Sequence, residues 1–192
     1  MALDSIGATK EFLERSLGQS TYETPDEARY EVEGCEVSLS MADRAVTAVT
    51  VELAPTCQFD VAGLIGSESP VVVRGALTFA RFEQLFGQAG YTSPCLSLCG
   101  NAYDPYVDAV VPGSRANGVV DIAANALFVS DEVLDAASVW REQLTAKAGE
   151  EYVTGTRFNC ERTHNDIARS AFAAAQVDRI QFGRSLGTDD CG

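Results

Sequence analysis

The residues best suited to covalent chemistry surround the only histidine of the chain. Cys160 precedes His164 by four residues, and Asp166 follows it by two. A histidine can activate a neighbouring thiol, and a third group must orient the imidazole. These residues define one hypothesis, a hydrolytic enzyme with its site near Cys160, His164 and Asp166. The competing interpretation is a solvated histidine at a helix start and a cysteine used in a disulfide.

A second pattern, Gly183-Arg184-Ser185-Leu186-Gly187, matches the G-x-S-x-G motif of serine hydrolases. That motif belongs on a turn from a strand to a helix, and the histidine of the triad follows it in the chain. Here the only histidine precedes the motif, and few residues come after it. We therefore interpret the match as accidental, and no catalytic residue is assigned.

The six cysteines are better suited to disulfides than to a metal. An even number of cysteines is typical of proteins from an oxidising compartment, whereas a metal site needs clustered ligands. Cys95 and Cys99 form the only close pair. Six cysteines allow 15 pairings, with free buried thiols as the alternative. Proximity in sequence suggests Cys35 with Cys57, Cys95 with Cys99, and Cys160 with Cys191.

The segment from Cys95 to Asp108 is the most unusual part of the sequence. Its Cys-x-x-x-Cys spacing differs from the Cys-x-x-Cys of redox sites, which favours a structural clamp. Oxygen-bearing side chains follow, but without the spacing of a calcium loop, so no metal is expected. The aromatic and acidic residues here are candidate anchors for a partner, or else cover a sheet edge. They are Tyr91, Tyr103, Asp104 and Tyr106.

The charge of the chain restricts its partners. The 14 basic and 28 acidic residues give a formal net charge of −14, which disfavours nucleic acids and anionic membranes and favours a partner with a basic surface. Simple solubility is the alternative explanation. No apolar run approaches the length of a membrane span, and the glycine-rich motifs of nucleotide-binding loops are absent from the sequence. We therefore expect no transmembrane segment and no cofactor.

Elements that could position these residues begin with a helix over residues 4–17, capped by Asp4 or Ser5 and ended by Gly18. Alternating apolar residues then predict strands over 29–41, with a bulge at Gly34, and over 45–53. Residues 57–61 are a candidate third strand.

The pattern then begins again. Residues 77–86 predict a second helix ended by Gly87, and residues 107–111 and 119–129 predict another hairpin. Without gaps, residues 12–22 align with residues 81–91 at an offset of 69, and four of eleven positions are identical. The sequence therefore indicates a repeated helix-then-hairpin unit, over residues 1–66 and 70–130.

The remaining residues, 131–192, are more helical. Helices are predicted over 131–147 and 165–175, the second capped by Asn165, and a closing strand over 176–186. The predicted fold is therefore α+β, with antiparallel sheet and packed helices in a single compact domain over residues 1–192.

This doubled plan resembles the beta-lactamase inhibitor protein-like fold, which also occurs in small outer-membrane lipoproteins. The residues that carry the likeness are Leu17-Gly18 and Phe86-Gly87, where a helix ends before an antiparallel sheet. The resemblance covers residues 1–130 and transfers no functional residue. It implies a protein-binding, non-enzymatic role in the cell envelope or outside the cell.

The leading hypothesis is thus a secreted or periplasmic protein-binding module, of the inhibitor or immunity type. A hydrolytic enzyme and a structural protein of the cell envelope are the alternatives. The first residues lack the charged and apolar regions of a signal peptide. The chain is therefore either cytosolic or a mature exported protein whose leader is not in this chain, and the cysteines favour the second. The identity of the partner and the oligomeric state stay open.

Overall fold

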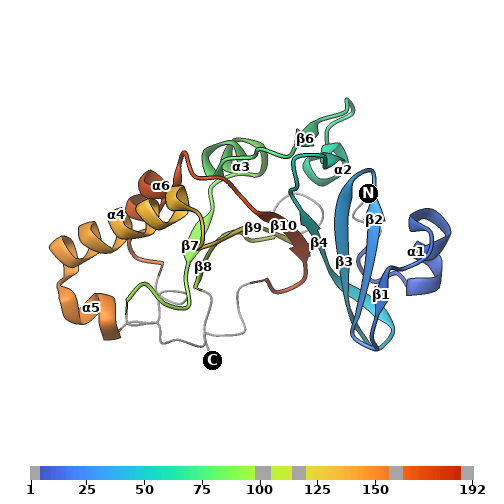
Figure 1. Cartoon of the computed structure of the whole chain (residues 1–192), viewed down its shortest axis with the longest axis horizontal. Helices are drawn as coiled ribbons and strands as arrows, with labels where there is room; N and C mark the ends of the chain where they lie inside the picture. Colours follow the sequence, from blue (N-terminus) through green and yellow to red (C-terminus); the bar gives the residue numbers. More distant parts are fainter. Residues whose placement is uncertain (1–4, 98–104, 114–119, 156–161, 187–192) are drawn as a thin grey trace.

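Eight strands form one antiparallel sheet in a computed structural model that describes residues 5–97, 105–113, 120–155 and 162–186 (Figure 1). The strands lie in the order β1-β2-β3-β4-β10-β9-β8-β7, and β5 and β6 form a separate two-stranded sheet. Six helices accompany them in the described part of the chain. The fold is α+β with antiparallel sheet, as the sequence predicts.

The strands are β1 (Tyr22–Glu23), β2 (Glu27–Val32), β3 (Cys35–Ala42), β4 (Ala45–Glu52), β5 (Gln58–Asp60), β6 (Val72–Arg74), β7 (Gly90–Thr92), β8 (Tyr106–Val111), β9 (Asp121–Leu127) and β10 (Arg179–Gly183). The helices are α1 (Lys10–Leu17), α2 (Ala62–Ile65), α3 (Phe79–Phe86), α4 (Asp131–Ala148), α5 (Glu150–Gly155) and α6 (Asn165–Phe172).

The strand order divides the large sheet into two halves that mirror one another. The first half runs from β1 to β4, and the second half runs from β7 to β10. They meet where β4 pairs with β10, with Val51 opposite Ile180. Each half follows a helix, α1 or α3. The second half extends past the expected boundary at residue 130, because its fourth strand is β10.

The helices that precede the two halves begin and end with the same chemistry. The side chains of Thr9 and Thr78 each accept the N–H of the residue three positions on, and each caps a helix of eight residues. Gly18 and Gly87 follow with φ angles of 85° and 111°, which glycine adopts without steric cost. The helix predicted over residues 4–17 begins later than expected, because Thr9 rather than an earlier residue supplies the cap.

Residues 29–41, predicted as one bulged strand, are instead two strands joined by a tight turn. Glu33 and Gly34 have φ angles of 52° and 76°. Positive φ at both central positions is the requirement of a two-residue type I′ hairpin loop. A bulge does occur, but its extra residue is Thr47 of β4, opposite the step from Ser40 to Met41 of β3. The hydrophobic alternation continues on both sides of the turn, so the pattern did not distinguish a turn from a bulge.

The disulfide between Cys35 and Cys57 is confirmed, with its sulfur atoms 2.09 Å apart. It connects the first residue of β3 to the residue before β5. A strand does form within residues 57–61, but β5 pairs with β6 rather than with the large sheet. The disulfide therefore fastens the small β5–β6 sheet to the large one.

Cys95 also takes part in a disulfide. The predictions for the other three cysteines, Cys99, Cys160 and Cys191, lie outside the described residues.

The predicted helical region forms α4, α5 and α6, which lie between β9 and β10 in the chain. Ser130 caps α4 and Gly149 ends it. In Figure 1, α3 lies above the strands of the second half, and α4, α5 and α6 lie to the left of these strands. The hairpin predicted within residues 107–129 is present as β8 and β9, and the closing strand is present as β10.

The core lies between the helices and one face of the sheet. Phe172 of α6 is 0% exposed, and the rings of four aromatic residues surround it at centroid distances of 5.6 to 6.4 Å. These are Phe79, Tyr91, Phe128 and Trp140. All six helices contribute buried residues to the same core, so every described helix packs on this side.

Candidate functional site

The candidate site is the face of the large sheet that points away from the helices, which we call the open face. Residues paired across neighbouring strands point to the same side of a sheet. The buried residues of β2, β3 and β4, such as Tyr30, Val37 and Val51, pair with one another on the covered side. The residues between them therefore form the open face. On the four middle strands these include Glu36, Ser38, Ser40, Ala48, Thr50, Glu52, Arg179, Gln181, Gly183, Asp121, Ala123, Asn125 and Leu127.

A chain of polar side chains crosses four neighbouring strands on this face. Asn125 Nδ2 of β9 donates to Asp108 Oδ1 of β8 at 2.6 Å. Arg179 Nε of β10 donates to Asn125 Oδ1 at 2.9 Å. Arg179 Nη1 also lies 3.8 Å from Glu52 Oε1 of β4. This chain crosses the seam at which the two halves of the sheet meet.

The polar chain borders a hollow of about 290 Å³ in the middle of the open face. Its walls are Thr50, Tyr106, Asp108, Ala123, Asn125, Arg179 and Gln181. Asn125 is 6% exposed, so its two amide hydrogen bonds hold the base of the hollow in one arrangement. The hollow can therefore receive a polar side chain of a partner without rearrangement of the sheet.

The electrostatics of the seam are governed by Glu52. Burial raises the pKa of its carboxyl group above the ordinary value of 4.5, Arg179 opposes this shift, and Glu36 adds to it. Loss of the arginine would therefore raise the pKa of Glu52 further, since desolvation and a like charge both disfavour the carboxylate.

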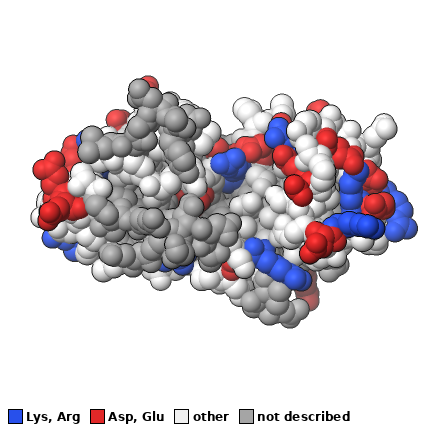
Figure 2. Space-filling view, turned by 90° about the horizontal axis from the view of Figure 1, so that it is seen from below, with Lys and Arg blue, Asp and Glu red and all other residues white. Residues whose placement is uncertain are grey.

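Acidic side chains accumulate on the first half of the open face. Glu31 of β2 lies directly opposite Glu36 of β3. Arg29 is the nearby cation: its Nη1 lies 3.9 Å from Glu36 Oε1, and its Nε donates to Glu27 Oε1 at 2.6 Å. Figure 2 shows the molecule from below, with acidic and basic side chains towards the right, the side on which β1 to β4 lie in Figure 1.

The open face of the second half is less accessible. Thr92 and Val110 are buried. A Cβ atom built on Gly90 of β7 would lie 3.1 Å from Cδ of Arg162, so this arginine packs over the strand. Leu186 packs against Ala48, Val110 and Ala123 on the same face. The accessible part of the open face therefore comprises β2, β3 and the stretches of β4 and β10 around Thr50 and Gln181, next to the central hollow.

The four residues predicted to bind a partner have separate positions. Tyr91 is 1% exposed and packs against Phe172 in the core, and burial raises the pKa of its hydroxyl. Its ring therefore presents no surface to a partner. Tyr106 is partly exposed on the open face and lines the central hollow. The predictions for Tyr103 and Asp104 lie outside the described residues.

The residues of the hydrolytic hypothesis surround the start of α6. His164 precedes the helix without a side-chain capping bond, and its ring lies 5.6 Å from that of Tyr152. Asp166 Oδ2 lies 3.7 Å from Lys147 Nζ, and Cys160 is outside the described residues. Asn165, predicted as the cap, instead accepts the N–H of Tyr91.

Ser185 of the G-x-S-x-G match is exposed and lies two residues after the end of β10, and Gly187 of the match lies outside the described residues. Within the described ranges, no three His, Cys, Asp or Glu side chains are grouped as metal ligands would be. The helices described here are all too short or too polar to span a bilayer.

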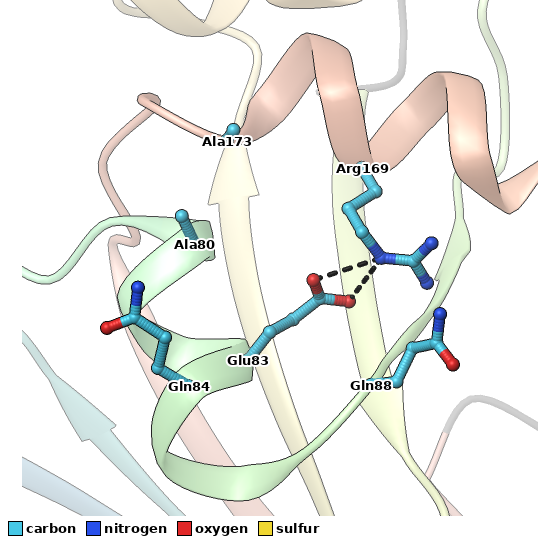
Figure 3. A pocket seen from close by; sticks show the side chains of 6 residues that line it. All are labelled: Ala80, Glu83, Gln84, Gln88, Arg169 and Ala173. Carbon is cyan, nitrogen blue, oxygen red and sulfur yellow. Dashed lines mark hydrogen bonds and ion pairs between the residues drawn. The ribbon is translucent and has the colours of Figure 1, made fainter.

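A second hollow, of about 420 Å³, lies between α3 and α6 on the covered side of the sheet (Figure 3). Glu83 and Arg169 point toward one another across it, and Arg169 Nε donates to both carboxylate oxygens at 2.9 and 3.0 Å. Glu83 also accepts the N–H of Ala89, and Arg169 donates to the carbonyl of Ala89. The hydrogen bonds of Glu83 and Arg169 join α3, α6 and the start of β7, so we assign these two residues a structural role.

The polar chain at the seam was not found from the sequence. Asn125 and Arg179 are 54 residues apart in the chain, and their contact depends on the pairing of β9 with β10. The available signal was alternation, because each lies next to a buried apolar residue, Ala124 or Ile180.

Comparison of the chain with protein-family models, with curated proteins and with solved structures gave no match.

Proposed function

We propose that this protein is an exported, non-enzymatic module that binds another protein on the open face of its sheet. The observation that carries the proposal is the unequal covering of the two faces. All six described helices pack on one side, while β2, β3, β4 and β10 present polar and charged side chains on the other. A rigid, partly hollowed sheet face is a suitable docking surface, because little of its conformational freedom is lost on binding.

The charge supports a partner with a basic surface. The chain has a formal net charge of −14, and the open face of β2, β3 and β4 contains Glu27, Glu31, Glu36 and Glu52, with Arg29 as its cation. Complementary charge accelerates the encounter of two proteins and disfavours wrong partners. An inhibitor or immunity protein needs both properties.

Export is supported by the disulfide between Cys35 and Cys57 and by the disulfide-bonded state of Cys95, since such bonds persist in oxidising compartments. The resemblance to the beta-lactamase inhibitor protein-like fold belongs to this proposal. It is supported by the two halves of the sheet, each of which follows a helix and has four antiparallel strands.

The proposal can be tested by affinity capture from a periplasmic or secreted fraction, at low and high salt. The bait is the wild-type chain, with Thr50→Arg as the open-face variant and Thr154→Arg, on exposed α5, as its matched control. We expect one basic protein to be retained by wild type and Thr154→Arg, and to be lost with Thr50→Arg or at high salt, where surface charge is screened. Retention of the same protein by Thr50→Arg would contradict the proposal, as would no retention by wild type.

A further inference from the structure

We infer that the partner contacts the open face with a basic α-helix that lies across β2, β3 and β4. This inference rests on the proposed function and specifies the element that the face binds. It is carried by the register of three glutamates, by their spacing and by the accessible part of the face.

The three glutamates form a row across neighbouring strands. Glu31 pairs with Glu36. Continuation of the antiparallel register past Val37 and Val51 places Glu52 opposite Glu36, and repulsion from Glu36 contributes to the raised pKa of Glu52. Like charges directly opposite one another destabilise a sheet. The row is therefore unfavourable in the free protein and becomes favourable when cations lie over it.

The cations near this row leave it incompletely neutralised. Arg29 is shared between Glu27 and Glu36, and Arg179 is shared between Asn125 and Glu52. Glu31 is exposed and, in the part of the chain that the structure describes, forms no ion pair with lysine or arginine. A basic partner would supply positive charge that this row lacks within the described residues.

The spacing of the row favours a helix over an extended segment. Neighbouring strands lie about 4.8 Å apart, so the row from β2 to β4 spans about 10 Å. On a helix, residues i, i+4 and i+7 share one face and span about 10.5 Å along the axis. In an extended strand, three successive residues on one face span about 13 Å. Three cations on one helix face therefore match the three carboxylates.

The accessible surface of the sheet agrees with a helix placed over β2, β3 and β4. The helix cannot lie equally on the second half, because Thr92 and Val110 are buried there and Arg162 packs over Gly90. A helix is about 10–12 Å across with its side chains, which fits the exposed surface of β2 to β4 beside the central hollow.

Two synthetic alanine-rich helical peptides of identical composition provide the test. One has three lysines at i, i+4 and i+7, and the other has the three lysines distributed around the helix. Their affinities are measured by isothermal titration calorimetry at low ionic strength. The proteins are wild type, Glu36→Gln and, as a control on exposed α5, Glu150→Gln.

We expect the one-face peptide to bind wild type about tenfold more tightly than its isomer, and Glu36→Gln but not Glu150→Gln to remove this preference. Equal affinity of wild type for both peptides would overturn the inference, as would an equal loss in both variants. If affinity capture retains a basic partner while the peptides show no preference, the helix is wrong and the binding face stands. If capture also fails, the proposed function is wrong as well.

Discussion

Replacement of Arg179 by methionine tests whether the polar chain at the seam holds the two halves of the sheet together. Methionine keeps an unbranched apolar stem of similar length and removes the guanidinium. Asn125 Oδ1 then loses the N–H that it accepts at 2.9 Å. A buried acceptor left without a partner costs about 1–3 kcal/mol. The pair with Glu52 is partly exposed on both sides, so it adds less than about 1 kcal/mol.

The loss of stability in Arg179→Met should depend on pH in a defined direction. Arg179 lowers the pKa of Glu52, while burial holds that pKa above 4.5, so the variant raises it further. A carboxyl group with a raised pKa in the folded state destabilises the fold above that pKa, and the penalty disappears below the unfolded value. The difference between variant and wild type is therefore largest near neutral pH and disappears as the pH falls through the raised pKa values of Glu52, which lie above 4.5.

Urea unfolding followed by tryptophan fluorescence measures both effects, because the single tryptophan, Trp140, is 3% exposed in the core. Arg141→Met, on the exposed side of α4, is the control and should change the free energy of unfolding by less than about 0.5 kcal/mol. If Arg179→Met is as stable as wild type, the polar chain does not secure the seam. If its loss is the same at all pH values, Glu52 plays no part in it.

Three further substitutions test the core, the disulfide and the seam by the same unfolding measurement. Phe172→Ala should lower the free energy of unfolding by about 3–5 kcal/mol, because it empties the centre of the aromatic cluster. Phe12→Ala, at a side chain that is 53% exposed, should lower it by less than about 0.5 kcal/mol. Similar losses in the two variants would refute this placement of the core. Serine at both Cys35 and Cys57, which are 22 residues apart, should cost about 3 kcal/mol, and an unchanged urea midpoint would contradict this. Gly183→Ala brings a Cβ to 2.7 Å from a Cβ of β4 and should cost about 1–3 kcal/mol; a variant of wild-type stability would show that β4 and β10 do not approach so closely.

Most elements of the fold follow from local signals, and the binding face does not. Caps and stops such as Ser130 and Gly149 define α4 within the chain itself. Strands followed from alternation, but Glu33 and Gly34 could form a bulge or a turn, and only the pairing of β2 with β3 decides between them. The open face depends wholly on long-range pairing. Alternation along one strand predicts that its two faces differ in burial, but it does not predict which strands are neighbours.

Tyr22 and Tyr91 show why the repeat in the sequence does not duplicate the binding face. They align at the same offset as the two helices, yet Tyr22 is 50% exposed and Tyr91 is 1% exposed. Tyr22 pairs with Arg29 on the open face, whereas Tyr91 pairs with Ala109 on the covered face. Each tyrosine follows its helix-ending glycine by four residues, so the difference lies in strand pairing: a register change of one residue moves every side chain of a strand to the other face. Tyrosines at aligned positions are therefore a core residue in one half and a surface residue in the other. The repeat accordingly supplies one accessible docking surface rather than two.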